Sequence, residues 1–248
     1  MSTSIRRLGR PEGLAATRLL CLPPAGAGPS LYYGLLALDS SAVEICPVSL
    51  PGRENRLSEA LPASMDELAE RLARELAPAL DRDYAILGYS MGALLGHELI
   101  RRWRAWGLPE PGMFFALGAR APQVPFARDV PLHQLDEEAF KQALIDIGGT
   151  PPELLQDAEA MAIFEPILRG DLRNCETYVY RPMPPLSMPI HAFVGDDDTL
   201  MTADDAAPWQ TLTTGTFELH RLASGHLLSR PELLAIGQRI VALWTAAR

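Results

Sequence analysis

The sequence predicts an α/β fold with a mostly parallel, doubly wound sheet and one helical insertion. Candidate strands and helices alternate along most of the chain, as they do when each strand is followed by a crossover helix. The candidate strands are continuous apolar runs, which is typical of parallel strands buried on both faces. Residues 121–181 interrupt this alternation with helical patterns and no convincing strand. Because 248 residues suit one large domain better than two, we expect a single domain over residues 1–248.

Composition and charge exclude several classes of function. Hydrophobic residues make up 48% of the chain and charged residues 21%, as in soluble globular proteins, and no apolar run is long enough to span a bilayer. Residues 1–13 carry charge but lack the apolar segment of a signal peptide, so we expect a cytoplasmic protein. The net charge of -9 argues against nucleic acid as a partner. Three widely spaced cysteines indicate buried free thiols rather than disulfides or a metal site: Cys21, Cys46 and Cys175.

The first element is a short apolar strand over residues 17–22, which stops at two prolines because proline cannot donate a strand hydrogen bond. The loop A-G-A-G-P-S follows, and Ser30 at its end is placed to cap a helix over residues 31–38. This loop is where α/β-hydrolases place one half of an oxyanion hole. A flexible turn or a phosphate loop are the alternatives, but a phosphate loop normally has a lysine nearby and none is present.

The next two elements are a strand over residues 42–50 and an amphipathic helix over residues 64–80. The strand closes at P-G-R-E-N-R, and the helix opens with a capping box formed by Ser64 and Glu67. They continue the alternation of strand and helix.

Residues 84–96, Y-A-I-L-G-Y-S-M-G-A-L-L-G, contain a glycine-flanked serine between a strand at 85–87 and a helix at 93–106. The pattern G-x-S-x-G is typical of a sharp turn that exposes a nucleophilic serine at a helix N-terminus. Ser90 is therefore the candidate nucleophile, and the amide of Met91 is the second candidate oxyanion donor. The pattern is also compatible with an ordinary glycine-rich turn. Only catalytic partners of the serine elsewhere in the chain can distinguish the two interpretations.

An apolar strand at 112–118 is suited to the middle of a parallel sheet, and the insertion at residues 121–181 follows it. Helices are expected there over residues 136–147 and 153–162. We interpret the insertion as a helical lid over the site, while a peripheral helical decoration remains the alternative.

The sheet resumes with strands at 189–194 and 216–222, and a helix at 231–246 ends the pattern. D-D-D follows the first of these strands, and S-G-H-L-L follows the second. Both therefore lie at carboxyl ends of parallel strands, where open α/β sheets carry their sites.

A serine needs an adjacent base, and the base needs a carboxylate to fix its tautomer. The chain order of serine, acid and histidine is that of α/β-hydrolases. We assign the acid to Asp198, with Asp197 as the alternative, and the base to His226. The remaining histidines are expected to be packed or surface residues: His97, His133, His191 and His220.

With these residues identified, the sequence resembles the type II thioesterases, the stand-alone α/β-hydrolases that accompany polyketide and nonribosomal peptide synthetases. The resemblance covers nearly the whole chain. It rests on L-P-P-A-G-A-G (22–28), L-P-G-R-E-N-R (50–56), G-Y-S-M-G (88–92), R-A-P (120–122), G-G-T-P-P-E-L-L (148–155), P-I-L-R-G-D-L-R-N-C-E-T-Y (166–178), G-D-D-D (195–198) and S-G-H-L-L (224–228).

The resemblance implies that Ser90, Asp198 and His226 carry the family's triad and that the amides of Ala25 and Met91 form its oxyanion hole. The chain departs from the family pattern at two positions. The family more often has histidine where this chain has Tyr89, and its early loop often ends in two glycines where this chain has Ala27 and Gly28.

The activity implied by the resemblance is hydrolysis of acyl groups from the 4'-phosphopantetheine arm of an acyl carrier protein or peptidyl carrier protein, with no metal or cofactor. We expect a monomer. Because carrier domains tend to be acidic, five arginines are candidates for docking: Arg53, Arg56, Arg169, Arg173 and Arg181. Three other functions share the motifs: a small-ester esterase, an acyltransferase or cyclase, and a carrier-binding subunit without activity.

Overall fold

The computed structural model describes residues 5, 15–126, 129–148, 150 and 152–248. Its sheet has six strands in the order β2-β1-β3-β4-β5-β6, and every neighbouring pair is parallel. This arrangement confirms the predicted α/β class. The strands are β1 (Thr17–Leu22), β2 (Val43–Pro47), β3 (Tyr84–Tyr89), β4 (Met113–Leu117), β5 (Ile190–Gly195) and β6 (Phe217–Leu222).

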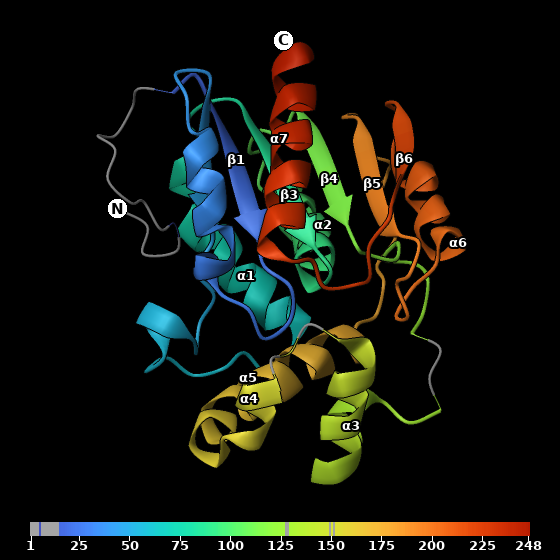
Figure 1. Cartoon of the computed structure of the whole chain (residues 1–248). Helices are drawn as coiled ribbons and strands as arrows, with labels where there is room; N and C mark the ends of the chain where they lie inside the picture. Colours follow the sequence, from blue (N-terminus) through green and yellow to red (C-terminus); the bar gives the residue numbers. More distant parts are fainter. Residues whose placement is uncertain (1–4, 6–14, 127–128, 149, 151) are drawn as a thin grey trace.

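Successive strand residues point to opposite faces of the sheet, and helices cover both faces (Figure 1). Leu20 and Leu22 of β1 pack in the same core as α1 (Met65–Leu76) and α2 (Met91–Ala105). Leu19 and Cys21 pack in a second core with η1 (Pro29–Leu38) and α7 (Arg230–Ala246). Burial on both faces is the reason why β1 is apolar from Leu19 to Leu22.

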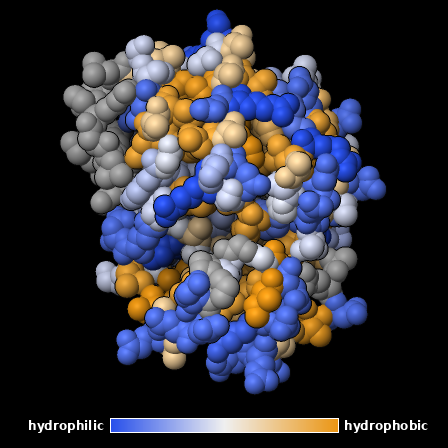
Figure 2. Space-filling model, viewed as in Figure 1, coloured by the Kyte–Doolittle hydropathy of each residue, from blue (hydrophilic) through white to orange (hydrophobic). Residues whose placement is uncertain are grey.

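Between β4 and β5 the chain forms three helices: α3 (Glu137–Ile147), α4 (Pro152–Gln156) and α5 (Ala158–Glu176). They lie beyond the carboxyl ends of the strands, while α7 ends at the opposite side of the molecule (Figure 1). Buried Phe140, Leu144 and Leu168 give the three helices a small core of their own. Hydrophobic side chains also reach the surface of this part of the molecule (Figure 2), including Ile145 and Ile163.

The observed elements differ from the predicted ones in two places. Residues 29–38 form a 3₁₀ helix that starts after Gly28, so Ser30 lies inside it and donates its hydroxyl to Glu54 instead of capping it. The helix expected at 153–162 is two helices, because Asp157 caps a new helix that continues past Pro166 to Glu176. The short elements are η2 (Glu54–Arg56), η3 (Ala77–Ala79), η4 (Leu132–Gln134), α6 (Ala203–Ala206) and η5 (Ala207–Leu212).

Cys21, Cys46 and Cys175 are buried thiols that form no disulfide with one another, as the sequence predicted. None of the described helices has the length and apolarity that a membrane crossing requires. Residues 1–13, apart from Ile5, lie outside the described residues, as do Gly149 and Pro151 of the G-G-T-P-P-E-L-L motif.

Candidate active site

The turn between β3 and α2 holds Ser90 in a backbone conformation that residues other than glycine rarely adopt. Its φ and ψ angles are 50° and -115°. The flanking glycines are required because a Cβ atom on Gly88 would lie 2.4 Å from the Cα of Ala93, and one on Gly92 would lie 2.1 Å from the carbonyl oxygen of Leu22. The strand, the helix and β1 therefore meet too closely for side chains, and the serine is left at the helix N-terminus.

Ser90, His226 and Asp198 form a continuous chain of hydrogen bonds. The Oγ atom of Ser90 lies 3.0 Å from Nε2 of His226, and Nδ1 of His226 lies 2.7 Å from Oδ2 of Asp198. Because an ionised carboxylate only accepts, Nδ1 carries the imidazole proton and Nε2 is free to accept from the serine hydroxyl. The structure thus brings together three side chains from three separate strand ends.

The loop after β5 holds the acid in place. The side chain of Asp198 is fully buried, and its Oδ1 atom accepts from the backbone N–H groups of Leu200 and Met201 at 2.8 and 3.2 Å. Its other oxygen is left to His226. The neighbouring Asp197 is exposed and has no contact with the imidazole, so the preference for Asp198 agrees with the geometry.

Tyr89, one of the two departures from the family pattern, holds the loop that carries the base. Its buried hydroxyl donates to the carbonyl of His226 at 2.6 Å and accepts from the N–H of Leu228 at 2.8 Å. Burial raises the pKa of Tyr89 well above its usual value, so the hydroxyl stays protonated and can donate. No motif in the sequence indicates this role of Tyr89.

The two candidate oxyanion donors, the amides of Ala25 and Met91, both border the same cavity as Ser90. Neither amide has a hydrogen-bond partner among the described residues. The amide of Met91 is the first of α2, where the helix itself supplies no acceptor and its dipole favours negative charge. The next amide after Ala25, that of Gly26, instead donates to Asp171 at 2.8 Å.

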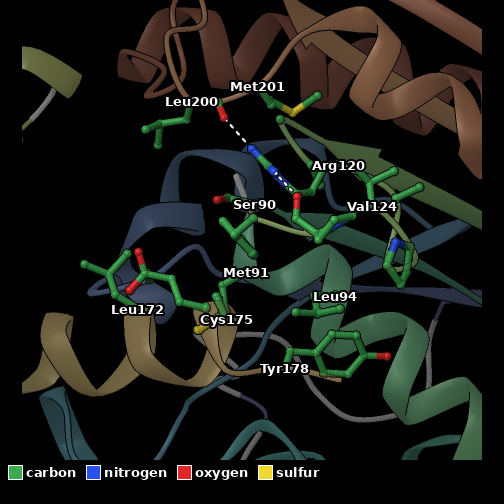
Figure 3. Close-up of a pocket in the computed structure, with 18 of the residues that line it drawn as sticks. Ser90, Met91, Leu94, Arg120, Val124, Leu172, Cys175, Tyr178, Leu200 and Met201 are labelled. Atoms are coloured by element: carbon green, nitrogen blue, oxygen red, sulfur yellow. Dashed lines mark hydrogen bonds between the residues drawn. The ribbon is translucent and has the colours of Figure 1, made fainter. Parts of the chain in front are cut away.

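Two cavities meet at Ser90 and His226. The larger, about 640 Å³, lies between α2, α5 and the segment that follows β4 (Figure 3). The smaller, about 300 Å³, extends under the helices between β4 and β5. Its walls are mostly apolar and include Leu144, Leu154, Phe164 and Leu168. Phe164 of α5 lines this cavity, whereas the neighbouring Ile163 is 55% exposed.

Arg120 borders the larger cavity and joins two of its walls. Its guanidinium donates to the carbonyl of Pro125 at 2.8 Å and to that of Leu200 at 2.7 Å, as Figure 3 shows. Leu200 belongs to the loop that anchors Asp198. Cys175 also borders this cavity, but burial raises the pKa of its thiol well above the usual value, which makes it a poor nucleophile.

His191, His220 and Glu218 form the one group of possible metal ligands among the described residues. Arg239 donates to Nδ1 of His220 at 2.7 Å, so the proton of this ring lies on Nε2, which is 3.0 Å from Nδ1 of His191. The two nitrogens are thus occupied by one hydrogen bond, between ring planes parallel to within 9°. A guanidinium on the same ring also opposes a cation, so the donor set does not suit a metal.

The expected docking role of the arginines is wrong for Arg53 and Arg56, because both are only 3% exposed. Arg53 pairs with Asp171, and Arg56 pairs with Glu59 and Glu75. Arg169 pairs with Glu165, and Arg181 pairs with Asp66. Arg173 donates to the carbonyl of Pro62.

One clue to the Asp171 contact was present in the sequence. Asp171 lies four residues after Ile167, three after Leu168 and four before Cys175, all of which are buried. These spacings place Asp171 on the buried face of its helix. A carboxylate on such a face requires a partner.

Comparison with known proteins identifies relatives over nearly the whole chain. Residues 17–236 match the thioesterase domain family. The gramicidin S biosynthesis protein GrsT from Aneurinibacillus migulanus is 37% identical over 212 residues, which cover 86% of this chain and 82% of that protein.

RedJ and BorB are among the solved structures that resemble the fold. The RedJ thioesterase from the prodiginine biosynthetic pathway in Streptomyces coelicolor is 35% identical with a TM-score of 0.83, covering 94% of this chain and 96% of that one. The type II thioesterase BorB from the borrelidin biosynthetic cluster is 33% identical with a TM-score of 0.83, covering 98% and 96% of the two chains. These matches confirm the resemblance to type II thioesterases that the motifs indicated. The chain therefore belongs to the thioesterase domain family and is an enzyme that hydrolyses thioester bonds.

Proposed function

We propose that the protein is an editing type II thioesterase that removes acyl groups from the 4'-phosphopantetheine arm of carrier proteins in a polyketide or nonribosomal peptide synthetase. The observation that carries this proposal is the hydrogen-bonded chain of Ser90, His226 and Asp198 at the junction of two cavities. The relatives support the biosynthetic setting, since GrsT, RedJ and BorB are each associated with the biosynthesis of a natural product.

The first half of the reaction transfers the acyl group to the enzyme. The hydroxyl of Ser90 attacks the thioester carbonyl while Nε2 of His226 takes its proton. Asp198 holds the imidazole through Nδ1 and stabilises its positive charge. The C–S bond then breaks and His226 gives its proton to the departing sulfur. Because thiols are acidic, with a pKa near 8.5, a thiolate leaves more easily than an amine does.

The negative oxygen of the tetrahedral intermediate needs preorganised donors. We assign these to the amides of Ala25 and Met91, whose N–H groups have no other partner in the described part of the chain. The positive end of the α2 dipole adds to their effect.

The second half of the reaction releases the free acid. Water enters, gives a proton to Nε2 of His226 and attacks the ester of Ser90; the same two amides stabilise the new intermediate. Ser90 regains its proton from His226 when the C–O bond breaks. Together the two halves convert one thioester and one water molecule into a free acid and a thiol.

The two cavities suit the two parts of such a substrate. The smaller one is lined mainly by aliphatic and aromatic side chains and suits an acyl chain. The larger one is bordered by Arg120, Gln123 and Glu176 as well as apolar groups, and suits the amide-rich phosphopantetheine arm. In this proposal the helices between β4 and β5, within residues 121–181, act as a lid that separates the reacting carbonyl from bulk water.

The test is a panel of acyl groups loaded on phosphopantetheinylated carrier domains, with release of free acid as the readout. Carrier-bound thioesters should be cleaved much faster than a p-nitrophenyl ester of equal chain length. Equal rates on both would indicate a general esterase. Transfer of the acyl group to an added alcohol or amine instead of water would indicate an acyltransferase.

A further inference from the structure

A buried ion pair joins the helices over the site to the loop that carries Ala25. Asp171 of α5 is 1% exposed, and Arg53 of the loop after β2 is 3% exposed. The pair is bidentate: Nη1 of Arg53 contacts Oδ2 of Asp171, and Nη2 lies 2.9 Å from Oδ1. Each charge is thus neutralised by the other, as a buried carboxylate requires.

Both members of the pair also hold the backbone of residues 25–27. Oδ2 of Asp171 accepts from the N–H of Gly26 at 2.8 Å, and Nη1 of Arg53 donates to the carbonyl of Ala27 at 3.3 Å. A further hydrogen bond, from the N–H of Ala27 to the carbonyl of Pro24, closes the turn. The loop is therefore held on either side of Gly26.

Gly26 itself shows how closely α5 approaches this loop. Its φ angle is +75°, in the left-handed region, and a Cβ atom placed on it would lie 3.0 Å from Leu168 and 3.1 Å from Phe164 of α5. The bond to Asp171 fixes the peptide plane between Ala25 and Gly26, and the amide of Ala25 belongs to the preceding plane, which is joined to it at the Cα atom of Ala25.

We infer that Arg53 and Asp171 are positioning residues that fix the Ala25 amide as an oxyanion donor. This inference rests on the proposed role of Ala25. The pair touches neither Ser90 nor the cavities, so its effect passes through the loop. It also makes the donor depend on the placement of α5: the helix that covers the site supplies the carboxylate that holds the loop.

The decisive variant is the double replacement Arg53→Met with Asp171→Leu. Apolar residues of similar volume often replace a buried ion pair without loss of the fold, whereas removal of one partner leaves a buried charge. The double variant removes both contacts to the loop. Asp171→Asn is the second variant: it keeps the side-chain shape, removes the charge and replaces one acceptor oxygen with an NH₂ donor, so it cannot accept from both Arg53 and Gly26 as the carboxylate does.

The matched control is Arg18→Met with Glu44→Leu. Arg18 is also buried and ion-paired, with Glu44 and with Asp81, but it lies near the start of β1, whereas Ser90 follows the carboxyl end of the neighbouring β3. It reports the general effect of removing a buried pair.

The readouts are kcat and KM on an acyl carrier and on p-nitrophenyl butyrate, together with inhibition by butylboronic acid, which forms a tetrahedral adduct on serine. For the double variant we expect kcat to fall by tenfold to a hundredfold on both substrates, with KM changed by less than threefold. The inhibition constant of the boronic acid should rise by a similar factor. For Asp171→Asn we expect kcat to fall threefold or more, again with little change in KM. The control should keep kcat within twofold.

The inference is overturned if the folded double variant keeps kcat within twofold, or if KM alone changes. Should the double variant not fold, Asp171→Asn decides by the same criteria. The ester keeps this test separate from the proposed function: a wild-type protein that cleaves the ester and ignores the acyl carrier would contradict the carrier substrate, and the effect of the pair would still be measured.

Discussion

The Oγ atom of Ser90 lies 3.0 Å from Nε2 of His226, although 136 positions separate the two residues in the sequence. They meet because β3 and β6 belong to one parallel sheet and both residues follow the carboxyl ends of their strands. The parallel sheet thus brings the proposed nucleophile and its proposed base within hydrogen-bonding distance.

Removal of either member of this pair should abolish turnover. We expect Ser90→Ala and His226→Ala each to lose on the order of 10⁶ in kcat, because triad members act as a unit. Asp198→Ala should lose less, since it leaves the base in place. Asp197→Ala is the control: its side chain is exposed, and kcat should stay within twofold. A severe loss in Asp197→Ala with an active Asp198→Ala would reassign the acid.

Tyr89→Phe should lower both stability and kcat. The change leaves the carbonyl of His226 and the N–H of Leu228 buried without their partner, at a cost of about 1–3 kcal/mol in the free energy of unfolding. Because the base sits on this loop, we expect kcat to fall roughly tenfold or more. Chemical denaturation and initial rates measure the two effects.

Tyr84→Phe is the matched control for Tyr89→Phe. Tyr84 is a buried tyrosine at the other end of β3, and its hydroxyl donates to the carbonyl of Pro109 at 2.7 Å. We expect this variant to lose stability and keep kcat. Equal losses of kcat in the two variants would contradict a positioning role for Tyr89.

Gly92→Ala should prevent the elbow from forming. The added Cβ would lie 2.1 Å from the carbonyl oxygen of Leu22, and this backbone atom cannot move without disturbing β1. We expect a loss of more than about 3 kcal/mol in the free energy of unfolding, or no soluble protein. Gly34→Ala, where an added Cβ meets nothing within 4 Å, should be tolerated. A stable Gly92→Ala enzyme would contradict the close packing.

His97 should make the protein sensitive to acid. Burial lowers the pKa of His97 to about 4, and Arg101 and Arg104 act in the same direction while Glu98 opposes them. An unfolded histidine takes up its proton near pH 6.5 and the folded one only near pH 4. Stability is therefore fully present above pH 6.5 and falls as the pH drops toward 4, on the order of 3 kcal/mol.

The variant His97→Leu tests this dependence, because both ring nitrogens lack a hydrogen-bond partner among the described residues. Urea denaturation between pH 7 and pH 4 should show a flatter curve for the variant than for the wild type. Parallel curves would show that another group causes the acid sensitivity. His191 and His220 remain in both proteins, so their contribution cancels.

The elements that the sequence predicted well share one property: their signal is local. Strands β1 to β5 are buried almost throughout and mostly apolar, which made them recognisable, and β6 was predicted as well although it is only partly buried. The glycines of the elbow mark a turn by themselves. The order of Ser90, Asp198 and His226 then depended only on which strand each residue follows. The helix expected at 153–162 was wrong for a local reason as well. Asp157 starts a new helix, and Pro166 lies inside this helix without ending it.

The contacts that were missed join residues far apart in the sequence. Arg53 and Asp171 are separated by 118 positions, and nothing near Arg53 shows that its charge is buried rather than exposed. The same holds for Tyr89, whose hydroxyl meets the His226 loop 137 positions later. Such pairs are decided by tertiary packing, which a single sequence does not display.

In the proposed mechanism, Ser90 carries the acyl group during turnover. The most direct measurement mixes the enzyme with an acyl-loaded carrier protein, quenches the reaction within milliseconds and determines the intact mass of the enzyme. We predict a transient mass increase equal to the acyl group, located on the peptide that contains Ser90 and absent from Ser90→Ala. Release of free acid by Ser90→Ala at the wild-type rate, or an adduct on another residue, would contradict the mechanism.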